Sequence, residues 1–304
     1  MAEATAKAAA KAAFVALAGR PSVGKSTLVN LLCGAKVAIV SAVPQTTRNA
    51  VRGIVTRPAG QLVFVDTPGR HASEKKFNKK LMSVAEKALD DAELVLYVLD
   101  ATRSPGPEEQ AIAGRLKGLE ERTVAAINKC DAAGADPQKL LDFLKSSLPG
   151  LDPSRCLKIS CFKKEGTDIL LDCLFTMAGE GDPLYPEDYY TDQDLAFRIS
   201  EIIREKAMNR LREELPHSIY VEVADTELRD DNKRLWVRAF IITERESQKG
   251  MIVGKGGEMI KAIGQAARKE LNSILDWKVD LDLRVKTGKD WRHNDKILKK
   301  ITGS

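Results

Sequence analysis

The stretch from Gly19 to Thr27 constrains this chain more than any other part of the sequence. It fits the pattern G-x-x-x-x-G-K-S of a phosphate-binding loop, whose glycines let backbone N–H groups face phosphate oxygens. In such a loop Lys25 supplies a charge to the β- and γ-phosphates, and the Ser26 hydroxyl is placed to ligate Mg²⁺. Apolar residues 14–18 predict a strand before the loop, and residues 26–32 predict a helix after it. The predicted nucleotide-binding residues here are Gly19, Arg20, Pro21, Ser22, Val23, Gly24, Lys25, Ser26 and Thr27.

Length and composition indicate a globular chain of about two domains. The chain has 304 residues, of which 43% are hydrophobic and 30% are charged. Its longest apolar run, residues 94–99, is too short to cross a bilayer. The five cysteines form no C-x-x-C pair, which argues against a disulfide framework or a zinc site and favours a reducing, cytoplasmic location. Residues 1–13, rich in Ala and Lys, are expected to be a disordered or frayed leader rather than a secretory signal.

The net charge of +5 is concentrated at the C-terminal end of the chain. Residues 249–304 contain 13 Lys and Arg against 7 Asp and Glu, a net charge of +6, so the rest of the chain carries −1. This excess fits either an ordinary solvated surface or a face that binds a polyanion, and charge alone does not separate the two.

Residues 36–49 have little regular pattern and predict a loop over the phosphates. A threonine hydroxyl in such a loop can complete the Mg²⁺ shell only while the γ-phosphate is present, which would make the loop a switch. Thr46 and Thr47 are both candidates, and we favour Thr47. The predicted switch residues are Gln45, Thr46, Thr47, Arg48 and Asn49.

A second signature follows two predicted strands, 50–55 and 61–65, which are joined by a turn at 57–60. It reads D-x-x-G, which puts a carboxylate near the metal and lets a glycine N–H meet the γ-phosphate. A turn after a strand also explains this common pattern, but its place downstream of a phosphate loop favours the nucleotide interpretation. The residues concerned are Asp66, Thr67, Pro68 and Gly69, and the predicted metal ligands are Ser26, Thr47 and Asp66.

The sequence N-K-C-D after the predicted strand 123–127 is the most specific clue to the base. The Asp131 carboxylate can accept hydrogen bonds from the N1–H and the exocyclic amine of guanine, an arrangement that adenine lacks. Asn128 would brace the loop, and the Lys129 stem would lie along the base. A further predicted strand, 156–159, leads to Ser160, Cys161 and Phe162, where a backbone N–H is placed to meet the guanine carbonyl oxygen.

Helical patterns at 77–89, 108–119, 137–148 and 167–177 alternate with these strands. The alternation predicts an α/β P-loop domain with a mostly parallel sheet, helices on both faces and every motif at the carboxyl end of a strand. Residues 14–178 resemble the translation-factor-like GTPases, and the runs P-Q-T-T-R and D-T-P-G-R-H resemble the Era family. The resemblance implies that residues 19–27 and 128–131 bind GTP and that Asp66 lies beside Mg²⁺.

The residues that would catalyse hydrolysis are less clear from the sequence. Many GTPases carry a glutamine after D-x-x-G to orient water, whereas Arg70 and His71 follow it here. Arg70, where Era-like proteins generally have an apolar residue, either stabilises the transition state or faces solvent, and His71 either holds a water or does nothing. Related GTPases often have asparagine in place of Ser22 to hold K⁺ beside the phosphates, so we expect K⁺ to stimulate this chain little.

The second half begins after a Gly-, Pro- and acid-rich linker at 179–194, which we expect to dock through Tyr185, Tyr189 and Tyr190. A helix is predicted at 195–215, strands at 218–223 and 235–243, a helix at 258–275 and a last strand at 279–286. With the apolar helix before G-K-G-G, this order resembles the KH domain in its prokaryotic, type II arrangement, an α+β fold. Residues 195–290 would form this domain, and 291–304 a basic C-terminal tail.

KH domains clamp the backbone of single-stranded nucleic acid with their G-x-x-G loop. Glycines permit close approach of a phosphate, Lys255 and Lys261 add charge, and an apolar groove would hold splayed bases. The predicted RNA-binding residues are Ile252, Val253, Gly254, Lys255, Gly256, Gly257 and Lys261. Trp236, Trp277 and Trp291 are interpreted as packing residues, with stacking on bases as the alternative.

Both halves together resemble the Era family over residues 14–290. The resemblance implies Mg²⁺-dependent GTP hydrolysis with slow intrinsic turnover, recognition of the 3′ end of small-subunit ribosomal RNA, and assistance to small-subunit maturation, by a protein we expect to be a monomer. Peripheral membrane association and organellar members also occur in the family, and nothing in the sequence requires either. Two alternatives are a nucleotide-sensing RNA-binding module without turnover and a signalling GTPase whose C-terminal domain binds protein.

Overall fold

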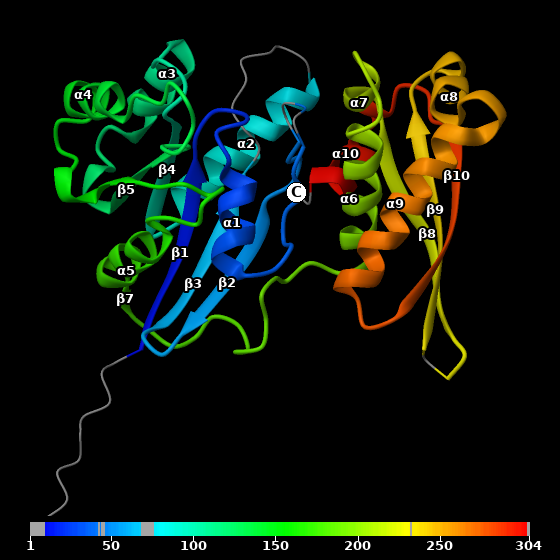
Figure 1. The fold of residues 1–304 in the computed structure, drawn as a ribbon, viewed down its shortest axis with the longest axis horizontal. Coiled ribbons are helices and arrows are strands. Elements are labelled where there is room, and N and C mark those ends of the chain that lie inside the picture. The colour runs from blue at the N-terminus through cyan, green and yellow to red at the C-terminus, as the bar shows by residue number, and fades with distance from the viewer. Residues whose placement is uncertain (1–9, 42, 44–45, 68–75, 232, 303–304) are drawn as a thin grey trace, which may run out of the picture. The chain divides into compact units, whose positions relative to one another are not determined.

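The computed structural model describes residues 10–41, 43, 46–67, 76–231 and 233–302, and the chain divides into two compact units (Figure 1). The first unit comprises Met1–Ala38 and Thr47–Asp192, and the second comprises Ile39–Thr46 and Gln193–Ser304. The predicted linker up to Asp192 therefore belongs to the first unit. The Ile39–Thr46 segment, predicted to be part of a loop in the nucleotide half, belongs to the second.

The first unit contains a sheet in the order β2-β3-β1-β4-β5-β6, with β7 paired to β1. β2 and β7 are antiparallel to their neighbours and the other strands are parallel, which confirms the predicted α/β P-loop fold. The strands are β1 Lys11–Ala18, β2 Val51–Arg57, β3 Gly60–Asp66, β4 Leu94–Asp100, β5 Thr123–Asn128, β6 Cys156–Lys158 and β7 Gly179–Glu180. The helices are α1 Lys25–Cys33, α2 Lys76–Asp91, α3 Pro107–Leu116, α4 Pro137–Ser147 and α5 Thr167–Met177.

Burial explains why these segments are strands. β3, β4 and β5 are buried along their whole length, and the apolar side chains of β4 and β5 form one core with those of α3 and α4. Near-continuous apolar runs are typical of parallel strands covered on both faces. The carboxyl ends of parallel strands lie at one edge of a sheet, so the residues that follow β1, β3, β4 and β5 converge there.

Three boundaries in this unit differ from the prediction. β1 begins at Lys11 because it pairs with β3 from Gly60 onwards, so the predicted leader ends at least three residues too late. α3 ends at Leu116, before Gly118 with its positive φ of 83°. The predicted linker contains β7, and it docks at Tyr185 and Tyr190 as predicted: the Gln61 side chain hydrogen-bonds the backbone of Leu184 and Tyr185, and the Ile54 N–H donates to the Tyr190 carbonyl. The Tyr185 hydroxyl also donates to the Asp192 carboxylate. Tyr189 is instead exposed.

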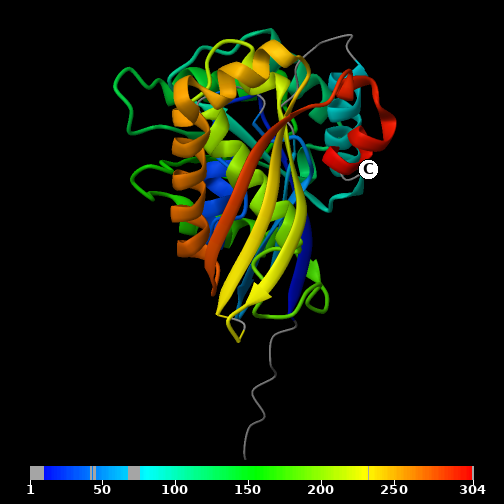
Figure 2. The same ribbon diagram turned by 90° about the vertical axis from the view of Figure 1, so that its right-hand side faces the viewer.

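The second unit has a three-stranded sheet in the order β10-β9-β8, with β8 antiparallel and β10 parallel to β9. Figure 2 shows this sheet with the long helix α9 alongside it. The elements are α6 Leu195–Met208, α7 Leu215–Ser218, β8 Tyr220–Arg229, β9 Arg234–Thr243, α8 Glu246–Val253, the 3₁₀ turn η3 Lys255–Gly257, α9 Glu258–Ile274, β10 Lys278–Thr287, η4 Trp291–His293 and α10 Asp295–Thr302. Apart from the short α7, η3, η4 and α10, this is the predicted type II KH order.

One side of this sheet and two helices share the core of the second unit. α6 contributes Ile199, Ile202 and Ile203, and α9 contributes Ile263, Ala267 and Leu271. They pack with alternate residues of β9, as expected for a sheet with one covered face. The core therefore ties α6 to the helix that starts at the G-K-G-G loop.

Three predictions for this unit were wrong in extent. The helix predicted to reach residue 215 ends at Met208, followed by Glu213 with a φ of 54° and by Pro216. β8 continues to Arg229, well into the region predicted to be a turn. The predicted basic tail contains α10, and Trp291 before it is fully buried, donates to the Ser218 carbonyl and contacts Tyr220.

No helix in the described part of the chain combines the length and the apolar character needed to cross a membrane.

Candidate nucleotide and RNA sites

The phosphate loop joins β1 to α1 and needs glycine at both glycine positions of its pattern. Gly24 caps α1 with a φ of 103°, and a Cβ there would lie 2.5 Å from the Asn128 side-chain nitrogen. A Cβ on Gly19 would lie 2.5 Å from the Val98 carbonyl oxygen of β4. The loop is therefore fitted closely to the strand ends around it, which fixes its backbone N–H groups.

Lys25 is buried at the first turn of α1. Its ammonium donates to the carbonyls of Gly19 (2.8 Å) and Arg20 (3.0 Å), within its own loop. Burial lowers the pKa of Lys25, opposed by the negative charges of Asp66 and Glu108. The side chain is thus held where a phosphate oxygen could replace a backbone carbonyl as its partner.

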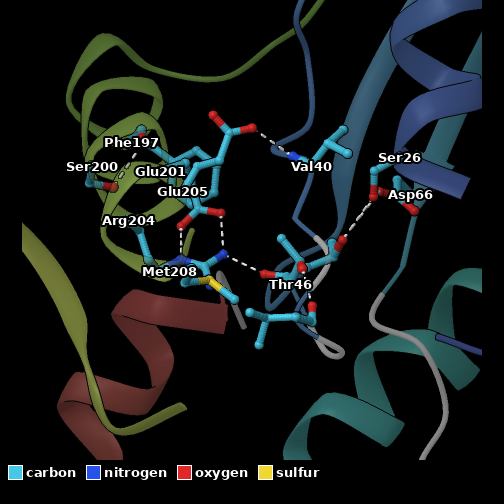
Figure 3. A network of polar contacts seen from close by, with 12 residues as sticks. Ser26, Val40, Thr46, Asp66, Phe197, Ser200, Glu201, Arg204, Glu205 and Met208 are labelled. Carbon is cyan, nitrogen blue, oxygen red and sulfur yellow. Dashed lines mark hydrogen bonds and ion pairs between the residues drawn. The ribbon is translucent and has the colours of Figure 1, made fainter. Parts of the chain in front are cut away.

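The three predicted metal ligands lie together: Ser26 at the start of α1, Asp66 at the end of β3 and Thr47 in the segment before β2. Ser26 Oγ donates to Asp66 Oδ2 at 2.6 Å, and Thr47 Oγ1 lies 3.1 Å from Ser26 Oγ and 3.3 Å from Asp66 Oδ2 (Figure 3). Thr46 instead donates its hydroxyl to the Val43 carbonyl at 2.7 Å. Of the two adjacent threonines, only Thr47 has its hydroxyl at this cluster.

The Asp66 carboxylate provides a test of whether this cluster fits a cation. Burial raises the pKa of Asp66, opposed by the charge of Lys25 and by hydrogen bonds from Ser26 and Thr47. Its second oxygen, Oδ1, is buried and has no hydrogen-bond partner among the described residues. Hydroxyl and carboxylate oxygens are the ligands that Mg²⁺ prefers, and an orphaned buried carboxylate oxygen is costly without a cation or its water shell. These residues therefore fit Mg²⁺.

The N-K-C-D segment at the end of β5 is tied to both neighbouring loops. Asn128 Nδ2 donates to the Val23 carbonyl at 2.9 Å, and its Oδ1 accepts the Cys161 N–H at 3.1 Å. Asp131 Oδ1 accepts the Ser160 hydroxyl at 2.6 Å. This is the bracing role predicted for Asn128. Because the Cys161 N–H is already paired, a guanine oxygen would have to share it with Asn128 or displace the Asn128 amide.

Asp100 is a member of this site that the sequence interpretation passed over. Its carboxylate accepts the Lys129 ammonium at 2.7 Å, while Lys129 also donates to the Ser22 carbonyl at 3.0 Å. Burial opposes ionisation of Asp100, but hydrogen bonds from Lys129 and Thr102 outweigh it and lower its pKa. The signal was available, since Asp100 ends β4 and pairs in register with Asn128 of β5.

The remaining predicted nucleotide-site residues differ in exposure or lie outside the described part of the chain. Phe162 is 88% exposed, and Arg48 is buried. The predicted residues that lie outside the described part of the chain are Gln45, Pro68, Gly69, Arg70 and His71.

The G-K-G-G loop joins α8 to α9 and has the backbone its glycines permit. Gly254, Gly256 and Gly257 have φ values of 73°, 59° and 80°, a region that other residues rarely adopt. Lys255, Gly256 and Lys261 are exposed. The loop therefore presents open backbone and two lysines at the start of a helix, where an anion is favoured.

One predicted RNA contact is wrong. Ile252 is fully buried in the core of the second unit, so it cannot touch a base, whereas Val253 remains partly exposed. Of the three tryptophans, Trp291 is a core residue and Trp277 packs against the core as predicted. Trp236 is instead covered by the guanidinium groups of Arg229 (4.6 Å) and Arg238 (4.8 Å).

Comparison with protein families supports both halves of this description. Residues 14–129 match the family model described as "50S ribosome-binding GTPase", and residues 214–292 match the KH domain.

Curated relatives match nearly the whole chain. GTPase Era of Treponema denticola is 49% identical over 95% of this chain and 98% of its own length. GTPase Era of Borreliella burgdorferi is 44% identical over 96% of this chain and 99% of its own length.

Two solved structures also match at 36% identity with a TM-score of 0.90. One is an Era variant from Aquifex aeolicus bound to GDP and AlF₄⁻, which covers 96% of this chain and 99% of its own. The other is Era in complex with MgGDPNP and nucleotides 1506–1542 of 16S ribosomal RNA, which covers 97% of this chain and 99% of its own. With relatives this similar over almost its full length, the chain belongs to the Era family of GTPases.

Proposed function

We propose that this chain binds GTP and Mg²⁺ with its first unit, hydrolyses GTP slowly to GDP and phosphate, and binds the 3′ end of small-subunit ribosomal RNA with its KH unit to assist small-subunit assembly. The observation that carries the nucleotide part is the cluster of Ser26, Thr47 and the orphaned oxygen of Asp66 beside the phosphate loop. The solved Era complexes with MgGDPNP, GDP and 16S ribosomal RNA support the choice of ligands.

The chain's own residues would act on the nucleotide in distinct ways. The phosphate loop orients the phosphates through its backbone N–H groups, and Lys25 gives up a loop carbonyl to reach them. Ser26, Thr47 and Asp66 would hold Mg²⁺, directly or through water, and the ion when bound neutralises charge on the phosphates. Thr47 would hold Mg²⁺ only while residues 46–48 keep its hydroxyl beside Ser26 and Asp66, which is the behaviour expected of a switch segment. Arg70 and His71 remain predicted catalytic residues.

Base selection would rest on Asp131 and Lys129. Asp131 uses one oxygen for Ser160 and keeps further acceptor capacity for the two guanine donors. Asp100 and the Ser22 carbonyl hold the Lys129 ammonium, so its stem has a fixed course for the base to lie against. We expect a monomer that works in the cytoplasm.

The direct test uses the full chain in three assays. Fluorescent GTP should bind with Mg²⁺ and be displaced by GTP but not by ATP. Single-turnover hydrolysis should be measurable at about 10⁻⁴ s⁻¹ or faster, the scale of unaided GTPases. A single-stranded oligonucleotide with the 3′-terminal sequence of small-subunit ribosomal RNA should bind more tightly than a scrambled one.

The outcomes separate this proposal from its rivals. Binding of GTP and RNA without turnover would indicate a nucleotide-sensing module. Turnover without RNA binding would indicate a GTPase whose second unit binds protein. Equal displacement by ATP would refute the assignment of the base-reading loop.

A further inference from the structure

The side chain of Arg20 runs from the phosphate loop to helix α3. Its Nε lies 2.7 Å from Glu109 Oε1, and the two side chains are only 12% and 7% exposed. Arg20 directly follows Gly19, the first glycine of the loop, whereas Glu109 lies in the first turn of α3, and both belong to the first unit. The sequence predicted Arg20 as a nucleotide-binding residue, but its charged group is paired with a carboxylate of the protein itself.

Glu109 is held in place from two sides. Helix α3 starts at Pro107 with Gly106 as its N-cap, so Glu109 occupies the third helical position. Its second oxygen, Oε2, accepts the Gly106 N–H at 2.9 Å, as the glutamate of a capping box does. Its carbonyl accepts the hydroxyl of Tyr97, a buried residue of β4, at 3.3 Å. Glu109 therefore presents Oε1 to Arg20 from a position that the helix and the sheet both fix.

Burial distinguishes this ion pair from those on the surface of the same unit. Arg57 and Asp168, for example, pair at 3.0 Å with side chains that are 34% and 86% exposed, and such pairs contribute little to stability. Arg20 and Glu109 are mostly removed from water, where either charge alone would be strongly unfavourable. The two side chains are therefore strongly constrained to remain together.

The ion pair acts on the part of the loop that turns away from β1. Gly19 has a φ of 149°, and a Cβ there would lie 2.5 Å from the Val98 carbonyl oxygen. The carbonyls of Gly19 and Arg20 both accept the Lys25 ammonium. In the proposed function Lys25 gives up a loop carbonyl to reach a phosphate, so the turn loses part of its support. The contact with Glu109 does not depend on Lys25 and would continue to hold the turn.

We propose that Arg20 and Glu109 are positioning residues for the phosphate loop. Their ion pair fixes the Gly19–Arg20 turn against the start of α3, so that the backbone N–H groups of the loop stay directed at the phosphates once Lys25 has moved to them. Neither side chain touches the nucleotide. The inference rests on the proposed binding of GTP by this loop, and it adds that helix α3 takes part in retaining the bound nucleotide.

The first test measures release of fluorescent GDP and GTP from the full chain by stopped flow. Arg20→Met keeps the length of the side chain and removes its charge. Glu109→Gln removes the other charge and keeps an oxygen for the Gly106 N–H. Each variant should release both nucleotides roughly 10- to 100-fold faster than the parent, the usual value of one hydrogen bond to a charged group. The association rates should change much less, because effects of this kind appear mainly in dissociation.

Base selection provides a readout that a general loosening of the site would also change. The preference for GTP over xanthosine triphosphate should depend on Asp131, which is held by Ser160 and not by α3. This ratio should stay parental in both variants even though each nucleotide is released faster. Arg57→Met is the matched control, because Arg57 pairs with Asp168 and Asp172 beside the amino end of β3, away from the phosphate loop. It should release nucleotide at the parental rate.

A double variant separates positioning from loss of stability. Arg20→Met or Glu109→Gln alone leaves one buried charge without its partner, so each should lower the melting temperature of the nucleotide-free protein. The double variant carries neither charge and keeps the Gly106 cap, so its melting temperature should return towards that of the parent. Its release of GDP should nevertheless stay at least about 10-fold faster than the parent's, and no faster than that of the faster single variant. Recovery of the parental release rate together with stability would show a purely structural pair and overturn the inference.

Hydrogen exchange provides a readout that needs no nucleotide. The double variant should exchange amides faster than the parent in peptides covering 18–25, while strands β4 and β5 stay protected, and Arg57→Met should match the parent in both regions. Arg20→Lys keeps the charge with a single donor group and should give a smaller change in the same direction. Parental exchange and parental release in the double variant would also overturn the inference. A parent that binds neither GDP nor GTP would overturn the proposed function instead.

Discussion

The chain contains two glycine-rich loops that precede helices, and they are specified in different ways. The loop at 19–24 is fitted to its surroundings, since a Cβ on Gly19 or Gly24 would collide with β4 or with Asn128. The loop at 254–257 is open at its tip, where a Cβ on Gly256 or Gly257 would meet nothing within 4 Å. The first loop depends on packing, whereas the tip of the second depends on backbone conformation and surface charge. In the second loop a collision is expected at its first glycine, since a Cβ on Gly254 would lie 2.8 Å from the Met259 Cβ. We therefore expect GTP binding to be most sensitive to added side-chain atoms in the loop at 19–24. We expect RNA binding to be most sensitive to changes of charge in the loop at 254–257.

The largest effect should come from Asp131→Asn, in the N-K-C-D segment of the nucleotide-binding unit. Ser160 donates to Asp131 Oδ1, so in the variant it should hold the amide oxygen and leave the NH₂ group towards the base. That group can donate to the 2-oxo group of xanthine but repels the guanine amine. The preference for GTP over xanthosine triphosphate should fall by roughly 10⁴-fold, as measured by competition binding. An unchanged preference would mean that N-K-C-D does not read the base, and Ser160→Ala in the Asn background should weaken the switch.

The next largest effect should come from Lys255→Asp combined with Gly256→Asp, in the open loop at 254–257. Both positions are exposed, so the fold should survive while the charge reverses where a phosphate approaches. Affinity for single-stranded RNA should fall by roughly 100-fold, with a shallower salt dependence, because fewer counterions are released. GTP binding should not change. Filter binding at several salt concentrations is the measurement, and parental RNA affinity in this variant would exclude the loop as the RNA site.

A matched pair of smaller changes tests the contrast itself. Gly24→Ala has both an unfavourable φ and a collision with the Asn128 amide, so GTP affinity should fall by roughly 30- to 100-fold. Gly256→Ala has only the unfavourable φ, so it should cost about 1 kcal/mol of stability or less and weaken RNA binding only a few-fold. Calorimetric GTP binding and thermal unfolding of both variants provide the comparison. Equal effects at the two glycines would remove the distinction between the loops.

The smallest effect concerns the monovalent cation. Ser22 lies within the fitted loop with a φ of 65°, a conformation that asparagine tolerates better than serine. Because the serine side chain is short, turnover in KCl should exceed that in NaCl by little, and Ser22→Asn should raise the ratio a few-fold. Arg70→Ala, assayed in parallel, should lower turnover if Arg70 stabilises the transition state. A strong K⁺ response in the parent would show that Ser22 suffices, and normal turnover of Arg70→Ala would remove Arg70 from the mechanism.

The sequence predicted the features that depend on neighbouring residues. It did not predict those that depend on contacts between residues far apart in the chain. The strands, the loop motifs at their ends and the KH order follow from apolar runs and glycines. Thr47, the threonine favoured from the sequence, has its hydroxyl beside Ser26 and Asp66. Ile252 was misplaced because apolar residues beside a G-x-x-G loop suit a groove and a core equally well. The contacts of Arg204 with the Thr46 carbonyl and of Glu205 with the Val40 N–H could not be predicted from the sequence. Each joins residues about 160 positions apart, and both side chains resemble any charged residue on a helix.

The assignment of Ile39–Thr46 to the second unit also has a consequence for dissecting the protein. Cutting the chain after Asp192 yields a fragment that has lost part of its own folding unit, leaving the buried side chains of Arg204 and Glu205 without the Thr46 carbonyl and the Val40 N–H. The two units are thus interleaved along the sequence. A fragment that carries the RNA-binding half should be supplied with residues 39–46, either fused ahead of residue 193 or added as a peptide. Recovery of thermal stability on adding that peptide would measure how much of the second unit is encoded in the first quarter of the chain.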